Sequence, residues 1–166
     1  MSYKNISFGK VDEFNVIVEI PQGSKNKYEL NEQTGEIELD WVFTNDFCFP
    51  FNYGFIPQTK GGDGDCLDAF VLSSHPVNMR TVVKCRAIGV IKLIDRGEQD
   101  DKIIAIALAD TEYNKYKDIS ELTFDYKTIF TDFFKELGIQ KNKVMKIEGF
   151  EGGVEALKEL NKAKIS

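Results

Sequence analysis

Short apolar runs with alternating or β-branched residues fill the first two-thirds of the chain. They predict strands over residues 16–20, 27–30, 36–40, 69–73, 82–94 and 102–109. The segment NEQTG separates the second run from the third and is typical of a hairpin turn. The longest run contains Gly89, and an isolated glycine within a strand indicates a bulge or a bend.

The pattern changes to helical spacing near the end of the chain. In YKTIFTDFFKELG the apolar residues recur at helical intervals, at Ile129, Phe130, Phe133, Phe134 and Leu137. We expect Gly138 to end this helix in a left-handed conformation. A strand over 144–148 and a terminal helix follow, the latter marked by Val154, Leu157 and Leu160. Many short strands and then two helices predict a mainly β fold, a small barrel with helices on its outside.

Composition narrows the class of protein. A chain of 166 residues with 42% hydrophobic and 29% charged residues fits one globular domain, which we assign to residues 1–166. The net charge of −6 and the lack of basic clusters argue against a nucleic-acid partner or an anionic membrane. The longest strongly apolar run, 103–109, is too short to cross a bilayer, and the first ten residues lack the apolar core of a signal peptide. We therefore expect a cytoplasmic protein.

Three aspartates stand close together in GGDGDCLDAF, residues 61–70. In an extended segment Asp63 and Asp65 share one face and Asp68 takes the other, so the three converge only if the chain turns, which the glycines permit. Farther on, Asp95 ends one apolar strand and Asp100 precedes the next, which would place both near one rim of a hairpin. Hard oxygen ligands in this number suit Mg²⁺, Mn²⁺ or Ca²⁺, and open carboxylate sites of this kind commonly bind phosphates through the metal. The alternative is that each aspartate is a solvated turn residue.

Other recognisable sites fit the chain poorly. An EF-hand loop starting at Asp63 would need glycine where Asp68 stands, and no GK[ST] motif is present to form a phosphate-binding P-loop. His75 is the only histidine, which excludes histidine-based triads and zinc sites with two histidine ligands. Cys48 and Cys85, with the cysteine at 66, form no CxxC pair, and we expect all three to be free thiols.

Four blocks in order give the chain a family resemblance. They are VIVEIPQGSKNKYEL, FPFNYGFIPQT, DGDCLDAFVL and CRAIGVIKLIDRGEQDDKIIA. From about residue 14 to residue 151 the chain resembles the soluble, magnesium-dependent inorganic pyrophosphatases. The resemblance implies a closed five-stranded OB-like barrel with two flanking α-helices in the C-terminal half, and a homo-oligomer, since bacterial members are often hexamers.

The resemblance also implies roles for individual residues. The aspartates of the family that bind metal match Asp63, Asp68, Asp95 and Asp100, and acidic residues around the metals match Glu19 and Glu29. The carboxylate that accepts the proton of the attacking water matches Asp65, and groups that hold the phosphate under attack match Lys27, Tyr53 and Lys102. The implied reaction is hydrolysis of pyrophosphate to two phosphates by direct attack of a metal-activated water, with Mg²⁺ as the cofactor or Mn²⁺ in its place.

Taken one at a time, several of these residues have a purely structural interpretation. Glu19, Lys27 and Glu29 could form cross-strand charge pairs on a sheet face. Tyr53 could be a core aromatic, and Lys102 could form a surface ion pair. These interpretations do not explain why the four blocks occur in one order.

The departures from the family gather in one part of the site. Trp41 replaces an arginine, and Leu137 and Gly138 replace a Tyr-Lys pair, all of which hold the leaving phosphate in the family. Phe49 replaces a tyrosine and Cys66 a proline. The chain therefore keeps the reaction centre and alters the leaving-group pocket.

Two accounts of the altered pocket remain open. Arg96, or one of Lys135, Lys141 and Lys143, could replace the lost positive charge. Alternatively, Trp41 could pack against a leaving group other than phosphate, which would make the protein a hydrolase of another phosphate compound. A non-catalytic metal- or phosphate-binding homologue is a further alternative, although such a protein would need neither Asp65 nor Lys27.

Overall fold

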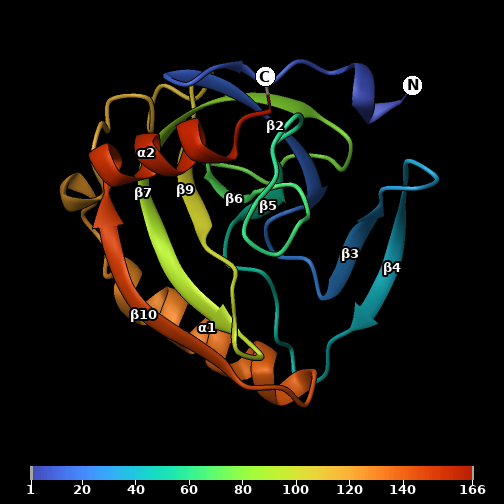
Figure 1. Ribbon diagram of the computed structural model, residues 1–166. Helices are drawn as coiled ribbons and strands as arrows, with labels where there is room; N and C mark the ends of the chain where they lie inside the picture. Colours follow the sequence, from blue (N-terminus) through green and yellow to red (C-terminus); the bar gives the residue numbers. More distant parts are fainter. Residues whose placement is uncertain (1, 166) are drawn as a thin grey trace.

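The structure is a computed structural model that describes residues 2–165 (Figure 1). Its strands are β1 (Gly9–Lys10), β2 (Glu13–Ile20), β3 (Asn26–Asn31), β4 (Glu36–Val42), β5 (Asn52–Phe55), β6 (Asp68–Leu72), β7 (Val82–Asp95), β8 (Glu98–Gln99), β9 (Lys102–Ala107) and β10 (Met145–Gly152). The helices are α1 (Tyr126–Gln140) and α2 (Gly153–Ala163), with short 3-10 turns η1 (Tyr3–Asn5) and η2 (Ile119–Glu121). Within this described part, no helix is long and apolar enough to cross a membrane.

Five strands pair in a closed ring. The order is β2-β5-β6-β9-β7, and β7 pairs again with β2. The β6–β9 pairing is parallel and the other four are antiparallel. This ring of five strands, with two helices beside it, confirms the predicted mainly β fold. Strand β5 was not predicted, because its four residues NYGF contain a glycine and show no alternation.

The long strand β7 pairs with β2, β8, β9 and β10, and its ladder is irregular near the middle. Its pairing with β9 shifts register between Ala87 and Gly89, which confirms the bulge expected there. A side chain at position 89 would lie 2.8 Å from the backbone oxygen of Glu151 and 3.0 Å from the side chain of Ile119. The glycine therefore lets β10 and η2 approach β7 closely.

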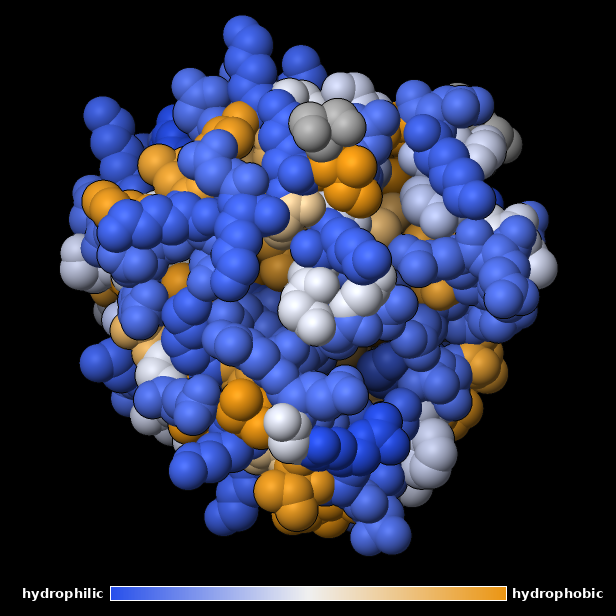
Figure 2. All heavy atoms as spheres, in the orientation of Figure 1, coloured by the Kyte–Doolittle hydropathy of each residue, from blue (hydrophilic) through white to orange (hydrophobic). Residues whose placement is uncertain are grey.

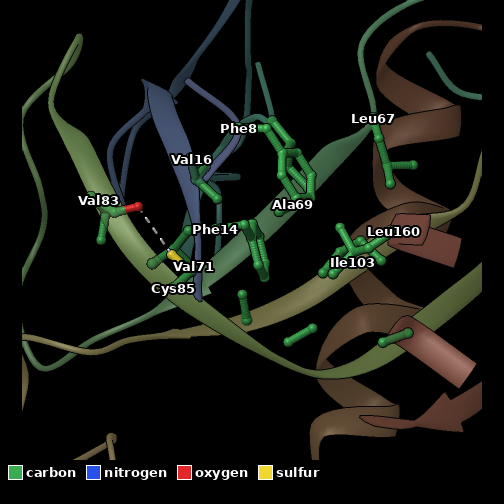
Figure 3. Close-up of a cluster of buried hydrophobic side chains, with 14 of the residues drawn as sticks. Phe8, Phe14, Val16, Leu67, Ala69, Val71, Val83, Cys85, Ile103 and Leu160 are labelled. Atoms are coloured by element: carbon green, nitrogen blue, oxygen red, sulfur yellow. Dashed lines mark hydrogen bonds between the residues drawn. The ribbon is translucent and has the colours of Figure 1, made fainter. Parts of the chain in front are cut away.

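Alternate residues of the ring strands build two hydrophobic clusters. In β6, Ala69 and Val71 belong to the cluster that also includes α2, while Phe70 and Leu72 belong to an aromatic-rich cluster packed against α1. Figure 3 shows the first cluster, where the Cys85 thiol donates a weak hydrogen bond to the carbonyl of Val83. Strands buried on both faces explain why runs such as 102–107 read as continuous apolar segments.

The helix α1 ends later than predicted. It continues to Gln140, and Asn142 takes the left-handed conformation with a φ of 52°. Gly138 lies inside the helix, where a Cβ atom would come 2.7 Å from the backbone oxygen of Lys143. The prediction was wrong because this glycine serves a close approach of the following segment, and not a change of backbone handedness.

The hairpin β3–β4 stands apart from the ring, as Figure 1 shows. Its pairing of Asn31 with Glu36 confirms the turn predicted at NEQTG, and a register shift follows the pair Lys27 and Trp41. The face of the molecule seen in Figure 2 is dominated by hydrophilic residues, with hydrophobic ones in small separate groups. Residues of the hairpin and of the ring line one cleft.

Candidate active site

One cleft of about 810 Å³ is lined by all ten residues to which the sequence gave a catalytic or metal-binding role. Its walls come from β2, the hairpin, the aspartate loop, the turn after β7 and the end of α1. The predicted residues that line it are Glu19, Lys27, Glu29, Tyr53, Asp63, Asp65, Asp68, Asp95, Asp100 and Lys102. Seventy-five positions separate Lys27 from Lys102 in the numbering, so the fold alone brings them together.

The parallel pairing of β6 with β9 places Asp68 beside Lys102. The Lys102 ammonium donates to Asp68 Oδ2 at 2.8 Å and to Asp100 Oδ2 at 3.0 Å. The Tyr53 hydroxyl donates to the same Asp68 oxygen at 2.8 Å. Lys102 is only 5% exposed, so its charge acts in a poorly solvated environment where electrostatic interactions are strong.

The aspartate loop turns as the glycines permit. Gly64 has a φ of 90°, and the carboxylate of Asp63 accepts a hydrogen bond at 3.0 Å from the backbone nitrogen of Asp65. Burial raises the pKa of Asp63, and burial together with the carboxylates of Glu32 and Asp68 raises the pKa of Asp65. The loop therefore holds carboxylates that are less acidic than solvated ones.

Glu19 joins the hairpin to the ring. It lies on β2, is 5% exposed, and accepts a hydrogen bond at 2.7 Å from the backbone nitrogen of Leu30. Burial and the nearby Asp68 carboxylate raise the pKa of Glu19 to about 8. Glu29, one residue before Leu30, is exposed and lies 3.7 Å from the Lys27 ammonium.

The turn after β7 carries the other two aspartates. The Lys143 ammonium donates to Asp95 Oδ2 at 2.8 Å, and Arg96 Nε lies 3.6 Å from Asp95 Oδ1. Asp95 Oδ1 is buried and has no hydrogen-bond partner among the described residues. Burial and the carboxylate of Asp68 raise the pKa of Asp100, although Lys102 opposes this. The expectation that Asp95 and Asp100 stand near one rim is consistent with their place in the same cleft.

Sequence reasoning missed two acidic residues. Asp40 Oδ2 accepts hydrogen bonds from Lys27 at 3.0 Å and from Lys141 at 2.7 Å. Glu32 accepts a hydrogen bond at 3.1 Å from the thiol of Cys66, and burial, together with this bond, raises the pKa of that thiol. Asp40 stood next to Trp41 in the sequence, but nothing there indicated its partners. All three cysteines are free thiols, as predicted.

The donor set fits a divalent metal in its chemistry. Among residues 2–165 no three acidic side chains, as they lie here, are close enough to hold one ion. However, burial and mutual repulsion raise the pKa of Glu19, Asp63 and Asp100, and an oxygen of Asp95 lacks a partner. Divalent cations prefer carboxylate oxygens, and one bound here would relieve that repulsion.

Comparison with known proteins agrees with this geometry. The family model "Inorganic pyrophosphatase" matches residues 16–165. A soluble inorganic pyrophosphatase of Zea mays is 44% identical over 137 residues, which cover 82% of this chain and 64% of that protein. Soluble inorganic pyrophosphatase 1 of Arabidopsis thaliana is 42% identical over 147 residues, covering 87% and 69%. The match therefore spans about two-thirds of the length of these plant relatives.

Solved bacterial structures match along almost their whole length. The inorganic pyrophosphatase of Thermus thermophilus superposes with a TM-score of 0.91 at 32% identity, covering 98% of this chain and 97% of that one. That of Helicobacter pylori gives 0.89 at 35% identity, covering 96% of each. Sequence blocks, closed ring and acidic cleft all agree with the match of the family model, and the chain belongs to the inorganic pyrophosphatase family.

Proposed function

We propose that this protein is a metal-dependent inorganic pyrophosphatase that hydrolyses pyrophosphate to two phosphates. The observation that carries the proposal is the convergence of all ten predicted residues on one cleft of a chain that belongs to this family. The cleft combines carboxylates for a metal with lysines and a tyrosine for a phosphate. The expected homo-oligomer and cytoplasmic location are part of the same proposal.

The metal would be held by side-chain oxygens of the cleft. We assign this role to Asp63, Asp68, Asp95, Asp100, Glu19 and Glu29, with Mg²⁺ as the ion or Mn²⁺ in its place. When bound, the metal neutralises substrate charge and makes the attacking water more acidic.

The reaction needs one proton acceptor and several phosphate-binding groups. As the oxygen of water bonds to phosphorus, the bridging P–O bond breaks, and its electron pair leaves with the second phosphate. Asp65 accepts the proton from that water, which its raised pKa favours. Lys27, Tyr53 and Lys102 donate hydrogen bonds to the phosphate under attack and stabilise the negative charge of the transition state.

A phosphate-release assay tests the function. With Mg²⁺, we expect turnover of pyrophosphate to exceed that of nucleotides and sugar phosphates, and we expect EDTA to abolish it. Faster release from a nucleotide or sugar phosphate would instead make the protein a hydrolase of another phosphate compound. The 40% exposure of Trp41, which could pack against such a leaving group, favours this second candidate. No release from any of these compounds, by folded and metal-loaded protein, would refute an enzymatic function and leave the non-catalytic alternative.

The pKa of Glu19 predicts a pH-dependent stability of the metal-free protein. Glu19 has a usual pKa of 4.5, and burial raises it to about 8 in the folded state. Between these values the folded state binds the proton and the unfolded state does not, so stability falls as pH rises through this window. We expect the melting temperature in EDTA to be lower at pH 8 than at pH 6, because the charged form is poorly solvated.

The variant Glu19→Gln isolates this contribution. It keeps an oxygen for the backbone nitrogen of Leu30 but cannot ionise. Its melting temperature in EDTA should therefore vary less between pH 6 and pH 8 than that of the parent protein. An unchanged slope would show that other groups cause the pH dependence.

A further inference from the structure

Trp41, the clearest departure from the family, contacts a lysine from another element of the fold. Trp41 stands on β4 where the family has an arginine, and the Lys141 ammonium lies 5.6 Å from the centre of its ring. Lys141 is the C-cap residue of α1 and lies a hundred positions after Trp41 in the sequence. The indole face attracts a cation, so a positive charge lies beside residue 41 although residue 41 itself is uncharged.

The position of Lys141 is defined by several contacts. Its backbone nitrogen donates to the carbonyl of Leu137 at 3.0 Å, which holds it at the helix end. Its side chain is 17% exposed and donates to Asp40 Oδ2 at 2.7 Å. Burial raises the pKa of Asp40, but the hydrogen bonds from Lys141 and Lys27 lower it overall. The Lys141 side chain is thus held at the wall of the cleft.

Two ammonium groups share one carboxylate at this wall. Lys27 and Lys141 both donate to Asp40 Oδ2, at 3.0 Å and 2.7 Å. The two lysines and Asp40 sum to one positive charge, and the exposed Glu29 lies 3.7 Å from Lys27 but, within the described residues, forms no ion pair with Lys141. Because both bond to the same atom, their nitrogens lie no farther apart than the sum of those distances. One diphosphate can therefore reach both.

The other candidate cations are less well placed. Lys135 lies in the groove between α1 and β10 and does not line the cleft. Arg96 has a side chain that is 71% exposed, and Lys143 donates its hydrogen bond to Asp95, which we assign to the metal.

We propose that Lys141, held against Trp41 and Asp40, supplies the positive charge that binds the leaving phosphate. This inference rests on the proposed function, in which Lys27 binds the phosphate under attack. In this proposal the altered pocket still binds a phosphate, and the ring of Trp41 positions Lys141. The cation that the family places at position 41 comes here from the end of α1.

The test compares Lys141→Ala with Lys141→Arg and with the control Lys135→Ala. We expect Lys141→Ala to lower kcat/KM for pyrophosphate by about 10- to 100-fold, the loss of one charge-assisted hydrogen bond. Lys141→Arg should keep most of the activity, and Lys135→Ala all of it. Adding Trp41→Arg to Lys141→Ala should restore part of the loss, because it returns a cation to position 41.

Binding of imidodiphosphate, a non-hydrolysable analogue, separates this inference from the proposed function. Calorimetry with Mg²⁺ should show about 10-fold or greater weakening in Lys141→Ala and none in Lys135→Ala. If the parent protein hydrolyses pyrophosphate and Lys141→Ala stays within twofold of it, the inference is wrong. If the parent protein hydrolyses nothing, the proposed function fails. In that case weaker binding of the analogue by Lys141→Ala would still support a phosphate site at Lys141, and equal binding would overturn that site.

Discussion

Replacing Asp65 with asparagine is expected to lower pyrophosphate turnover by about 10² to 10⁴-fold, the range typical of a lost general base. The amide cannot accept the proton of the attacking water. Burial and the carboxylates of Glu32 and Asp68 raise the pKa of Asp65, which makes it a better base than a solvated carboxylate. Phosphate release at saturating Mg²⁺ and pyrophosphate measures the effect.

The fold should survive this change. The side chain of Asp65 accepts no hydrogen bond within residues 2–165, so asparagine removes a repulsive charge and no contact. We expect an unchanged or higher melting temperature in EDTA, and binding of Mg²⁺ within a few-fold of the parent protein. Asp132→Asn, on an exposed position of α1, is the matched control and should keep full activity. A fully active Asp65→Asn variant would refute the assignment.

Replacing Gly54 with alanine is expected to destabilise the protein by about 3 kcal/mol, at the upper end for overpacking. Gly54 lies on β5 and pairs with Val18 on one side and Ala69 on the other. A Cβ atom there would overlap the backbone oxygen of Ile17 and lie 3.0 Å from the Cα of Val18. Backbone atoms of a paired strand cannot move aside as a flexible side chain can. The melting temperature should fall by about 6–12 °C, as measured by thermal unfolding.

Gly149→Ala provides the control for this prediction. Gly149 also lies in a strand, and a Cβ atom built there meets nothing within 4 Å. Its replacement should change the melting temperature by less than about 3 °C, since it adds no overlap. Equal effects of the two substitutions would show that loss of glycine flexibility matters more than the close approach of β2 and β5.

Local patterns predicted most helices and strands. They failed where a residue is required by contacts with a segment distant in the sequence. Strand β5 is only four residues long and carries Gly54, which weakens its local signal, yet it pairs on both sides within the ring. Gly138 follows an amphipathic run and predicts a helix end. Its actual neighbour is the carbonyl of Lys143, and that contact exists only after the chain turns back.

From the sequence by itself came the family resemblance and the ten candidate residues, all of which line one cleft. The clustered aspartates indicate a divalent metal, because residue type sets charge and ligand hardness. The phosphate-binding roles of the lysines and the tyrosine came from the family resemblance alone. The strand pattern likewise indicated a mainly β fold, since alternation and β-branching are local properties.

Only the tertiary structure decided which charges meet. The pairing of β6 with β9 sets Lys102 beside Asp68, and the end of α1 brings Lys141 to Asp40 and Trp41. Such contacts join positions far apart in sequence, so they depend on strand register and helix packing, which no local pattern encodes. Burial also depends on the whole fold, and it is burial that moves the pKa of Glu19 to about 8.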